Sequence, residues 1–146
     1  MRTLKIYALL LATFLIGGSK SFAQCTFAVI TGQPSPVQVC TGGSSTAVFS
    51  ITATGTSLLY QWQANTGSGY TNIGNSALYS GVTTPTLTVT NPTLSMTATD
   101  YRCTAIAGCG GPIALSNGVS LLVYTPLSIS TQPQNQTVCP GGNTSF

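Results

Sequence analysis

The chain has very little charge and no histidine. Its 146 residues include one acidic side chain, Asp100, and four basic ones. Three of the basic residues lie within the first 23 positions, so residues 24–146 keep only Arg102 beside Asp100. General acid–base catalysis needs a histidine, a pair of carboxylates or a lysine with a shifted pKa. The sequence also contains neither G-x-S-x-G nor a glycine-rich phosphate loop. We therefore predict no catalytic residue.

The same scarcity of charge excludes several classes of partner. Nucleic acids are bound through several lysines or arginines that neutralise phosphates, and an anionic membrane surface attracts basic clusters. Calcium sites usually collect several carboxylates. The five cysteines include no C-x-x-C pair and no histidine accompanies them, which is a poor ligand set for zinc. We expect no nucleic acid partner, no metal and no cofactor.

Long hydrophobic runs are also rare, and the one that exists lies at the N-terminus. Ile6–Ile16 is an apolar run of eleven residues that follows Arg2 and Lys5. Crossing a membrane takes about 20 apolar residues, so this run does not predict a membrane span. Small residues in Ser21–Ala23 place a cleavage site ahead of Gln24. Residues 1–23 are therefore predicted to be a cleaved signal peptide, and the mature chain to be exported.

Beyond residue 23, short alternating runs of apolar and polar residues predominate. Turn residues separate these runs every eight to twelve positions or so, which is typical of β-sandwiches and barrels. Ala47, Phe49 and Ile51 should share one buried face, and Leu87 and Val89 should also point inward. About 100 residues are involved, the usual size of one compact domain. The expected strands cover residues 37–39, 47–53, 59–63, 70–73, 86–90, 100–107 and 119–124.

A motif near the start of the domain returns near the end of the chain. QPSPVQVCTGG at 33–43 reappears as QPQNQTVCPGG at 132–142, an offset of 99 residues. A period of this size suits tandem whole domains better than a solenoid, whose repeats are about 20–50 residues long. We therefore expect a signal peptide (1–23), one domain (24–126) and the start of a second repeat (127–146). That start would lack a core of its own and be weakly ordered, as part of a longer array.

The residues at the centre of the domain resemble a known fold. Trp62, the pair Leu87 and Val89, and the run Tyr101–Cys103 are similar to the immunoglobulin-like pattern. That resemblance implies a β-sandwich of about seven strands in two antiparallel sheets. It also implies that Trp62 packs on an inter-sheet disulfide and that Tyr101 forms a tyrosine corner.

A narrower resemblance comes from six short motifs. VCTGG, YQWQ, LYSGVTT, TLTVT, DYRC and SNGVSLLV resemble the tandem immunoglobulin-like repeats of large surface proteins in gliding bacteria that use type IX secretion. The resemblance covers about residues 29–124 and again 129–146. It implies a secreted or bacterial cell-surface location.

Two positions depart from the family pattern. Ile51 stands where antibody-like domains keep their first core cysteine, and Cys40 lies eleven residues earlier. The family's acidic position, four residues before Tyr101, holds Thr97. We assign no role to Asp100.

Cysteine pairing is the next expectation. The four cysteines of the first unit allow three connectivities, and an exported protein meets oxidising conditions. In the resembled fold, Cys25 and Cys109 should lie at the same end of the domain. This favours Cys25–Cys109 together with Cys40–Cys103, so that Cys103 would be oxidised. Cys139 should be unpaired.

These observations support two main hypotheses about function. The first is a non-catalytic exported module of a larger repeat protein, acting as a structural spacer or in adhesion. Its partners would be neighbouring repeats, with surface glycans or other cell-surface proteins as further candidates. The second is a carbohydrate-binding accessory domain of an exported enzyme, with Tyr60, Tyr70, Tyr79 and Tyr124 as an aromatic platform. Packing in the core and at strand edges is the interpretation of these tyrosines that we favour. A small secreted enzyme is a third, weaker hypothesis.

Overall fold

The computed structural model describes residues 24–133, 135, 137 and 139–142, so the expected signal peptide lies outside the described residues. The described chain is all-β, as the sequence predicts, apart from one turn of 3₁₀ helix, η1 (Leu94–Met96). The strands are β1 (Val29–Gly32), β2 (Val37–Cys40), β3 (Thr46–Ser50), β4 (Thr52–Thr54), β5 (Leu58–Asn65), β6 (Tyr70–Asn72), β7 (Tyr79–Ser80), β8 (Thr86–Thr90), β9 (Thr99–Ala107), β10 (Ala114–Leu115) and β11 (Val119–Tyr124).

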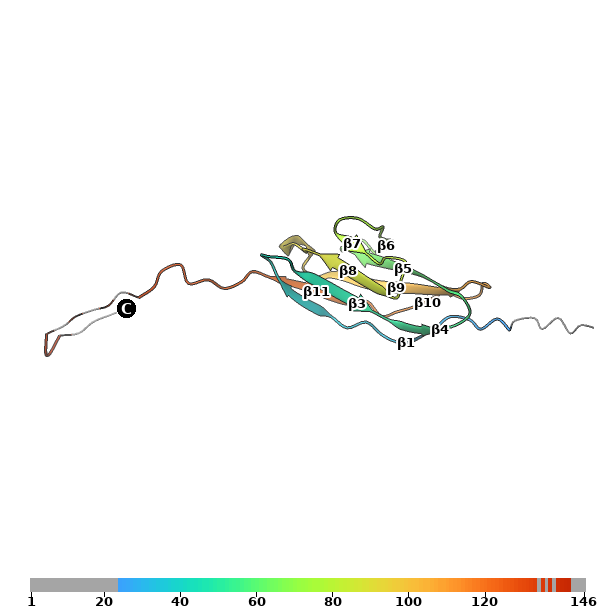
Figure 1. Cartoon of the computed structure of the whole chain (residues 1–146), viewed down its shortest axis with the longest axis horizontal. Coiled ribbons are helices and arrows are strands. Elements are labelled where there is room, and N and C mark those ends of the chain that lie inside the picture. The colour runs from blue at the N-terminus through green and yellow to red at the C-terminus, as the bar shows by residue number, and fades with distance from the viewer. Residues whose placement is uncertain (1–23, 134, 136, 138, 143–146) are drawn as a thin grey trace, which may run out of the picture.

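The strands form the two layers of a sandwich (Figure 1). One layer has the order β2-β11-β9-β5-β6, with β10 added to β9. The other has the order β3-β8-β7, and it is extended by the pair β1-β4 because β4 follows β3 after Ile51 alone. The expected sandwich is therefore present. One pair departs from the antiparallel arrangement: β2 runs parallel to β11, with Val37 opposite Leu121 and Cys40 opposite Tyr124.

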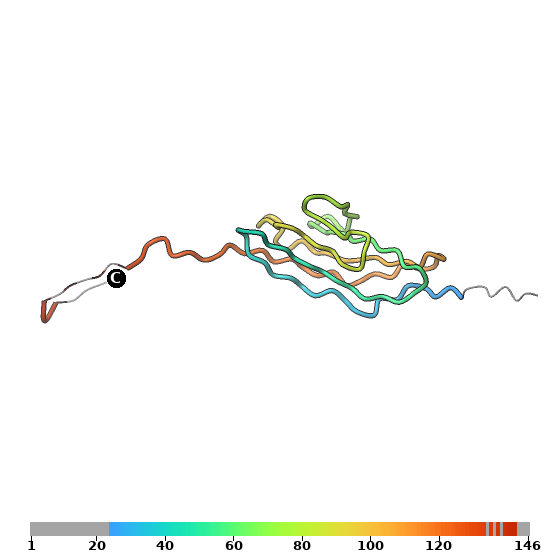
Figure 2. Tube along the Cα trace, in the orientation of Figure 1, coloured from blue at the N-terminus to red at the C-terminus, as the bar shows by residue number. Residues whose placement is uncertain are grey.

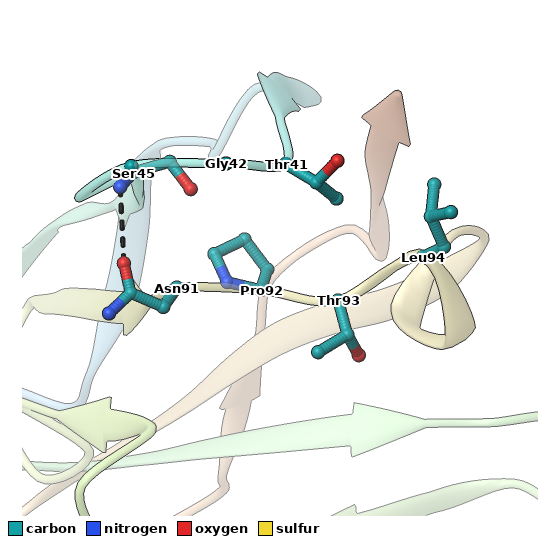
Figure 3. Close-up of a pocket in the computed structure, with 8 residues that line it drawn as sticks. Thr41, Gly42, Ser45, Asn91, Pro92, Thr93 and Leu94 are labelled. Atoms are coloured by element: carbon teal, nitrogen blue, oxygen red, sulfur yellow. Dashed lines mark hydrogen bonds between the residues drawn. The ribbon is translucent and has the colours of Figure 1, made fainter. Parts of the chain in front are cut away.

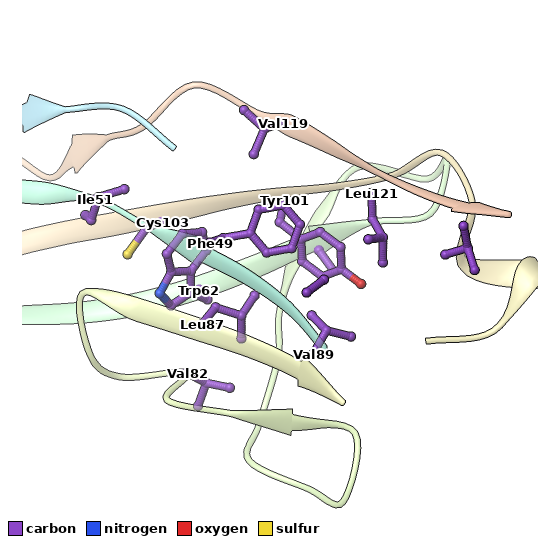
Figure 4. Close-up of a cluster of buried hydrophobic side chains, with 13 residues drawn as sticks. Phe49, Ile51, Trp62, Val82, Leu87, Val89, Tyr101, Cys103, Val119 and Leu121 are labelled. Carbon is purple, nitrogen blue, oxygen red and sulfur yellow. The ribbon is translucent and has the colours of Figure 1, made fainter. Parts of the chain in front are cut away.

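Alternation along the strands builds the core between the layers. In β9 every second residue from Thr99 to Ala107 is buried, while the residues between them are only partly covered. Ala47, Phe49 and Ile51 are buried, as are Leu87 and Val89, which confirms the predicted inward faces. Figure 4 shows these side chains meeting between the two sheets. Burial of apolar surface at about 25 cal/mol per Å² is the main source of stability for such a core.

The expected strand over residues 47–53 is divided into β3 and β4. Ile51 lies between them, and its amide donates to the carbonyl oxygen of Pro85 at 3.0 Å. The chain then continues into β4, which pairs with β1 rather than with β8. The break therefore marks the point where one strand changes partners.

The longest ladder joins β5 to β9, and its register decides which side chains are neighbours on the outer face of this sheet. Its register places Gln63 opposite Arg102. The Arg102 Nε donates to Gln63 Oε1 at 2.7 Å, and the guanidinium lies 3.9 Å from the centre of the Tyr70 ring. This cation–π contact holds the only basic residue after position 23 against the sheet.

The two ends of the described chain leave the sandwich in opposite directions (Figure 2). β11 ends at Tyr124, and the described residues that follow it form no strand. Leu127 and Ile129 are exposed. Residues 134, 136, 138 and 143–146 of the expected second repeat lie outside the described residues. Among the described residues, no helix has the length and hydrophobicity that a membrane span requires.

Candidate functional site

Trp62, Tyr101 and Cys103 meet in one buried cluster (Figure 4), but the disulfide expected beside Trp62 is not formed, because Cys103 is free. All three side chains have an exposed fraction of 0%. The Trp62 indole Nε1 donates to the carbonyl oxygen of Thr84 at 2.9 Å. The Phe49 ring centre lies 6.4 Å from that of Trp62 and 5.0 Å from that of Tyr101, within the range of favourable aromatic pairs. These residues are therefore committed to packing.

Tyr101 makes a different hydrogen bond from the one that a tyrosine corner implies. Its hydroxyl lies 3.2 Å from the Tyr79 hydroxyl, which reaches it from the other sheet, so the expected bond to nearby backbone is replaced. Burial first, and then this hydrogen bond, raise the pKa of Tyr101 far above its usual range. Thr97, at the family's acidic position, donates through its hydroxyl to the carbonyl oxygen of Val123 at 3.0 Å. At this position a neutral hydrogen bond from a hydroxyl therefore takes the place of an acidic side chain.

The predicted disulfide between Cys25 and Cys109 is confirmed. Their Cα atoms are 6.1 Å apart, and the bond joins positions separated by 84 residues. It ties the segment before β1 to the turn after β9. The first strand is thereby anchored at the N-terminal end of the sandwich.

The predicted Cys40–Cys103 disulfide is wrong, because sheet register places the two cysteines at different levels. Cys40 lies opposite Tyr124, whereas Tyr101 lies opposite Val119. Tyr124 is five residues beyond Val119, and Cys103 is two residues beyond Tyr101 in the opposite direction. Seven residues of strand span about 23 Å, and a disulfide needs Cα atoms within about 7 Å. Cys40 is also exposed, whereas Cys103 is buried.

Cys103 is therefore a free buried thiol, and the prediction that it is oxidised is wrong. Ile51, which stands at the family's first core cysteine, lies in the same buried cluster and supplies hydrocarbon where a second sulfur would be expected. Removal from water raises the pKa of Cys103 from 9.0 to about 12. Such a thiol is chemically inert at neutral pH. Cys139 is free and exposed, as predicted.

The four tyrosines proposed as a glycan platform do not share one surface. Tyr60 and Tyr79 pack against the core from opposite layers, which confirms the packing interpretation for these two. Tyr70 lies beneath Arg102. Tyr124 is the exposed last residue of β11. No shared aromatic platform results.

A shallow recess lies at the end of the sandwich where β11 ends. The loop after β2 and the segment after β8 enclose about 360 Å³. Ser45 N donates to Asn91 Oδ1 at 3.1 Å (Figure 3). Asn91 N donates to the Ser45 carbonyl oxygen at 2.8 Å. The Thr41 amide donates to the Tyr124 carbonyl at 2.7 Å, which fixes the recess beside the departing chain. It is lined by Thr41, Gly42, Gly43, Ser45, Asn91, Pro92, Thr93 and Leu94.

This recess could not be predicted from the sequence, because its two walls come from segments about 50 residues apart. Gly42 and Gly43 follow β2, Asn91 and Pro92 follow β8, and the recess exists only because the fold brings these two segments together. The lining is uncharged and offers hydroxyl, amide and apolar groups. Within the described part of the chain, no three histidine, cysteine or acidic side chains gather as a metal site.

Comparison with solved structures identifies the fold as immunoglobulin-like. Domains 1–4 of Sidekick-1 align at 19% identity and a TM-score of 0.56, over 75% of this chain and 27% of that one. A chimeric titin Z1Z2 aligns at 22% identity and 0.54, over 70% of this chain and 99% of that one. Extracellular domains 3–5 of Drosophila OTK align at 20% identity and 0.51, over 69% and 33%.

These similarities concern the fold alone. The chain spans about a quarter of the Sidekick-1 fragment that it matches. No family model matches the sequence. No curated protein matches it either.

Proposed function

We propose that residues 24–126 are a non-catalytic, exported immunoglobulin-like module of a larger bacterial cell-surface or secreted repeat protein. The module would space or present other domains, or take part in adhesion. One observation carries the proposal: a sandwich that is complete by Tyr124 is followed by a second copy of its opening motif, 99 residues on. A signal peptide in residues 1–23 would deliver the chain, and residues 127–146 would begin the next repeat.

The chemistry of the described residues supports this proposal. The Cys25–Cys109 disulfide suits an oxidising compartment. The aromatic residues at the centre of the domain are used in packing, and the recess at the C-terminal end is uncharged. Neighbouring repeats are the proposed partners, followed by surface glycans or other cell-surface proteins. The dispersed tyrosines leave the carbohydrate-binding alternative without a specific observation in its favour.

The test is an in-frame exchange in the parent protein on living cells. One strain would lack residues 24–126, and a second would carry an unrelated immunoglobulin-like unit of equal length in their place. A spacer predicts that the replacement restores surface display and attachment, whereas an adhesive module predicts that it restores display alone. Unchanged display and unchanged attachment in the deletion strain would contradict both forms of the proposal. Catalytic turnover by purified residues 24–126 would contradict the non-catalytic assignment.

A further inference from the structure

The repeat offset aligns the end of the first unit with the beginning of the second. Moved by 99 residues, Cys25 falls on Tyr124 and the four residues of β1 fall on 128–131. Tyr124 is still part of β11, where it lies opposite Cys40. In the second unit, the position equivalent to the disulfide-bonded Cys25 is therefore Tyr124, which is the last residue of β11 in the first unit.

Leu127 and Ile129 match core-facing residues immediately before and within the first strand. They correspond to Ala28, which is buried, and Ile30, which packs against the core cluster. In the described chain Ile129 has an exposed fraction of 75% and Leu127 is fully exposed. Their spacing of two places both on one face of an extended strand. The first unit thus leaves Leu127 and Ile129 exposed, although their spacing is that of a strand with one buried face. That pattern fits a strand that packs into the core of a following unit.

Only three residues, 125–127, separate β11 from the equivalent of β1. From the Cα atom of Tyr124 to that of Ser128, four steps of extended chain span at most about 14 Å. The next unit must therefore begin within that distance of the end of β11, where the recess lies. Figure 1 shows the chain leaving the sandwich at this end, beside η1. Leu94, the first residue of η1, lines the recess and is 49% exposed.

We infer that residues 127–142 open a second immunoglobulin-like unit that is joined without a linker and docks against the recess of the first. Leu127 and Ile129 enter the core of the second unit, and Leu94 lies in the interface. The occupant is the near end of that following unit, which suits the uncharged lining of the recess. This inference rests on the proposed array and adds that adjacent units hold a fixed orientation.

The orientation is tested with the parent chain from Gln24 through its second unit, using nitrogen-15 relaxation. We expect both units to share one rotational correlation time, about twice that of a single unit, because overall tumbling time scales with mass. Leu94→Asp should make the rotational correlation times of the two units differ and should shift each toward the value of an independent unit. Leu59→Asp is the matched control, because Leu59 is 62% exposed on β5, away from the recess. Independent tumbling in the unsubstituted chain, or equal effects of the two substitutions, would overturn the docked joint.

The strand assignment is tested separately in the same chain. Leu127→Ser and Ile129→Ser should each lower the melting temperature of the second unit by roughly 10 °C, as loss of buried apolar groups does in small domains. Ser128→Ala should leave it unchanged, because Ser128 corresponds to the exposed Val29. Destabilisation of the first unit, or an unaffected second unit, would refute the assignment. A folded second unit that tumbles freely would refute the docking and leave the array intact, whereas a parent chain without a second unit would refute both.

Discussion

At the scale of single residues, burial decides the chemistry of Cys103 and Tyr101. Each has its polar atom inside the sandwich: the Tyr101 hydroxyl pairs with another hydroxyl, whereas the Cys103 thiol makes only a long contact of 3.5 Å with the Thr104 carbonyl oxygen and otherwise lies among apolar side chains. A thiol tolerates this because its S–H is a weak donor and the group behaves as a small apolar side chain. The tyrosine hydroxyl does not, because an unsatisfied buried donor costs about 1–3 kcal/mol.

The first prediction concerns cysteine reactivity. In the native chain at pH 8, Cys40 and Cys139 should react with an alkylating reagent, because both are exposed and free. Cys103 should stay unmodified, since its buried thiol has a pKa of about 12 and little thiolate forms. Peptide mapping by mass spectrometry before and after unfolding measures this. A Cys40–Cys103 cross-link, or equal labelling of the two, would show that the assignment of free thiols is mistaken.

The second prediction concerns the tyrosine pair. Tyr79→Phe should destabilise the domain by about 1–2 kcal/mol, because the Tyr101 hydroxyl then stays buried without a partner. Adding Tyr101→Phe should recover much of this loss, since both partners are then apolar. Urea unfolding of Tyr79→Phe, Tyr101→Phe and the double variant gives the interaction free energy between the two hydroxyls. Strict additivity would mean that the two hydroxyls do not interact.

At the scale of elements, local pattern predicts a strand well and its partner poorly. The run over residues 86–90 became β8 without change, and 119–124 became β11, because the alternation that buries Leu87 or Leu121 is visible in the sequence itself. β1, β7 and β10 have only two to four residues and were missed, since short edge strands depend on the neighbour to which they bond.

The error in cysteine pairing has the same cause. The Cys40–Cys103 expectation was the pairing left once Cys25 and Cys109 were placed together, and only the parallel register of β2 on β11 shows that Cys40 lies about seven residues too far along the sheet. The recess was missed for a related reason, because its two loops meet only after β3 and β8 have paired. Pairing across layers and between distant strands is a tertiary property that a single sequence pattern does not encode.

The third prediction concerns the anchoring of β1. Replacing Cys25 and Cys109 together by alanine should lower the unfolding free energy by about 2–4 kcal/mol, as expected for a cross-link that closes a long loop. Hydrogen exchange should show β1 and its partner β4 losing protection first, since the disulfide lies directly before β1. Cys40→Ala is the control and should change neither. Equal stability of both variants would mean that the disulfide does not anchor the strand.

At the scale of the whole molecule, the arrangement of the two ends suits assembly in series. The described chain enters the sandwich at the disulfide end and leaves beside the recess at the other end (Figure 2). Units joined in this way add length without folding back on one another. Residues 24–146 have a formal charge of zero, so their contacts with water rely mainly on hydroxyl and amide groups. The fold class could thus be predicted from the sequence, whereas the surface that a partner contacts could not.

The most direct test of this account compares the stability of residues 24–126 with that of residues 24–146. If the first unit is complete by Tyr124 and the residues after it belong to the next repeat, both chains should unfold in denaturant with the same midpoint and slope. Their unfolding free energies should agree within about 0.5 kcal/mol, as is usual for changes to exposed residues. A loss of more than about 1 kcal/mol in the shorter chain, or its failure to fold, would contradict the account, because residues 127–146 would then belong to the first domain.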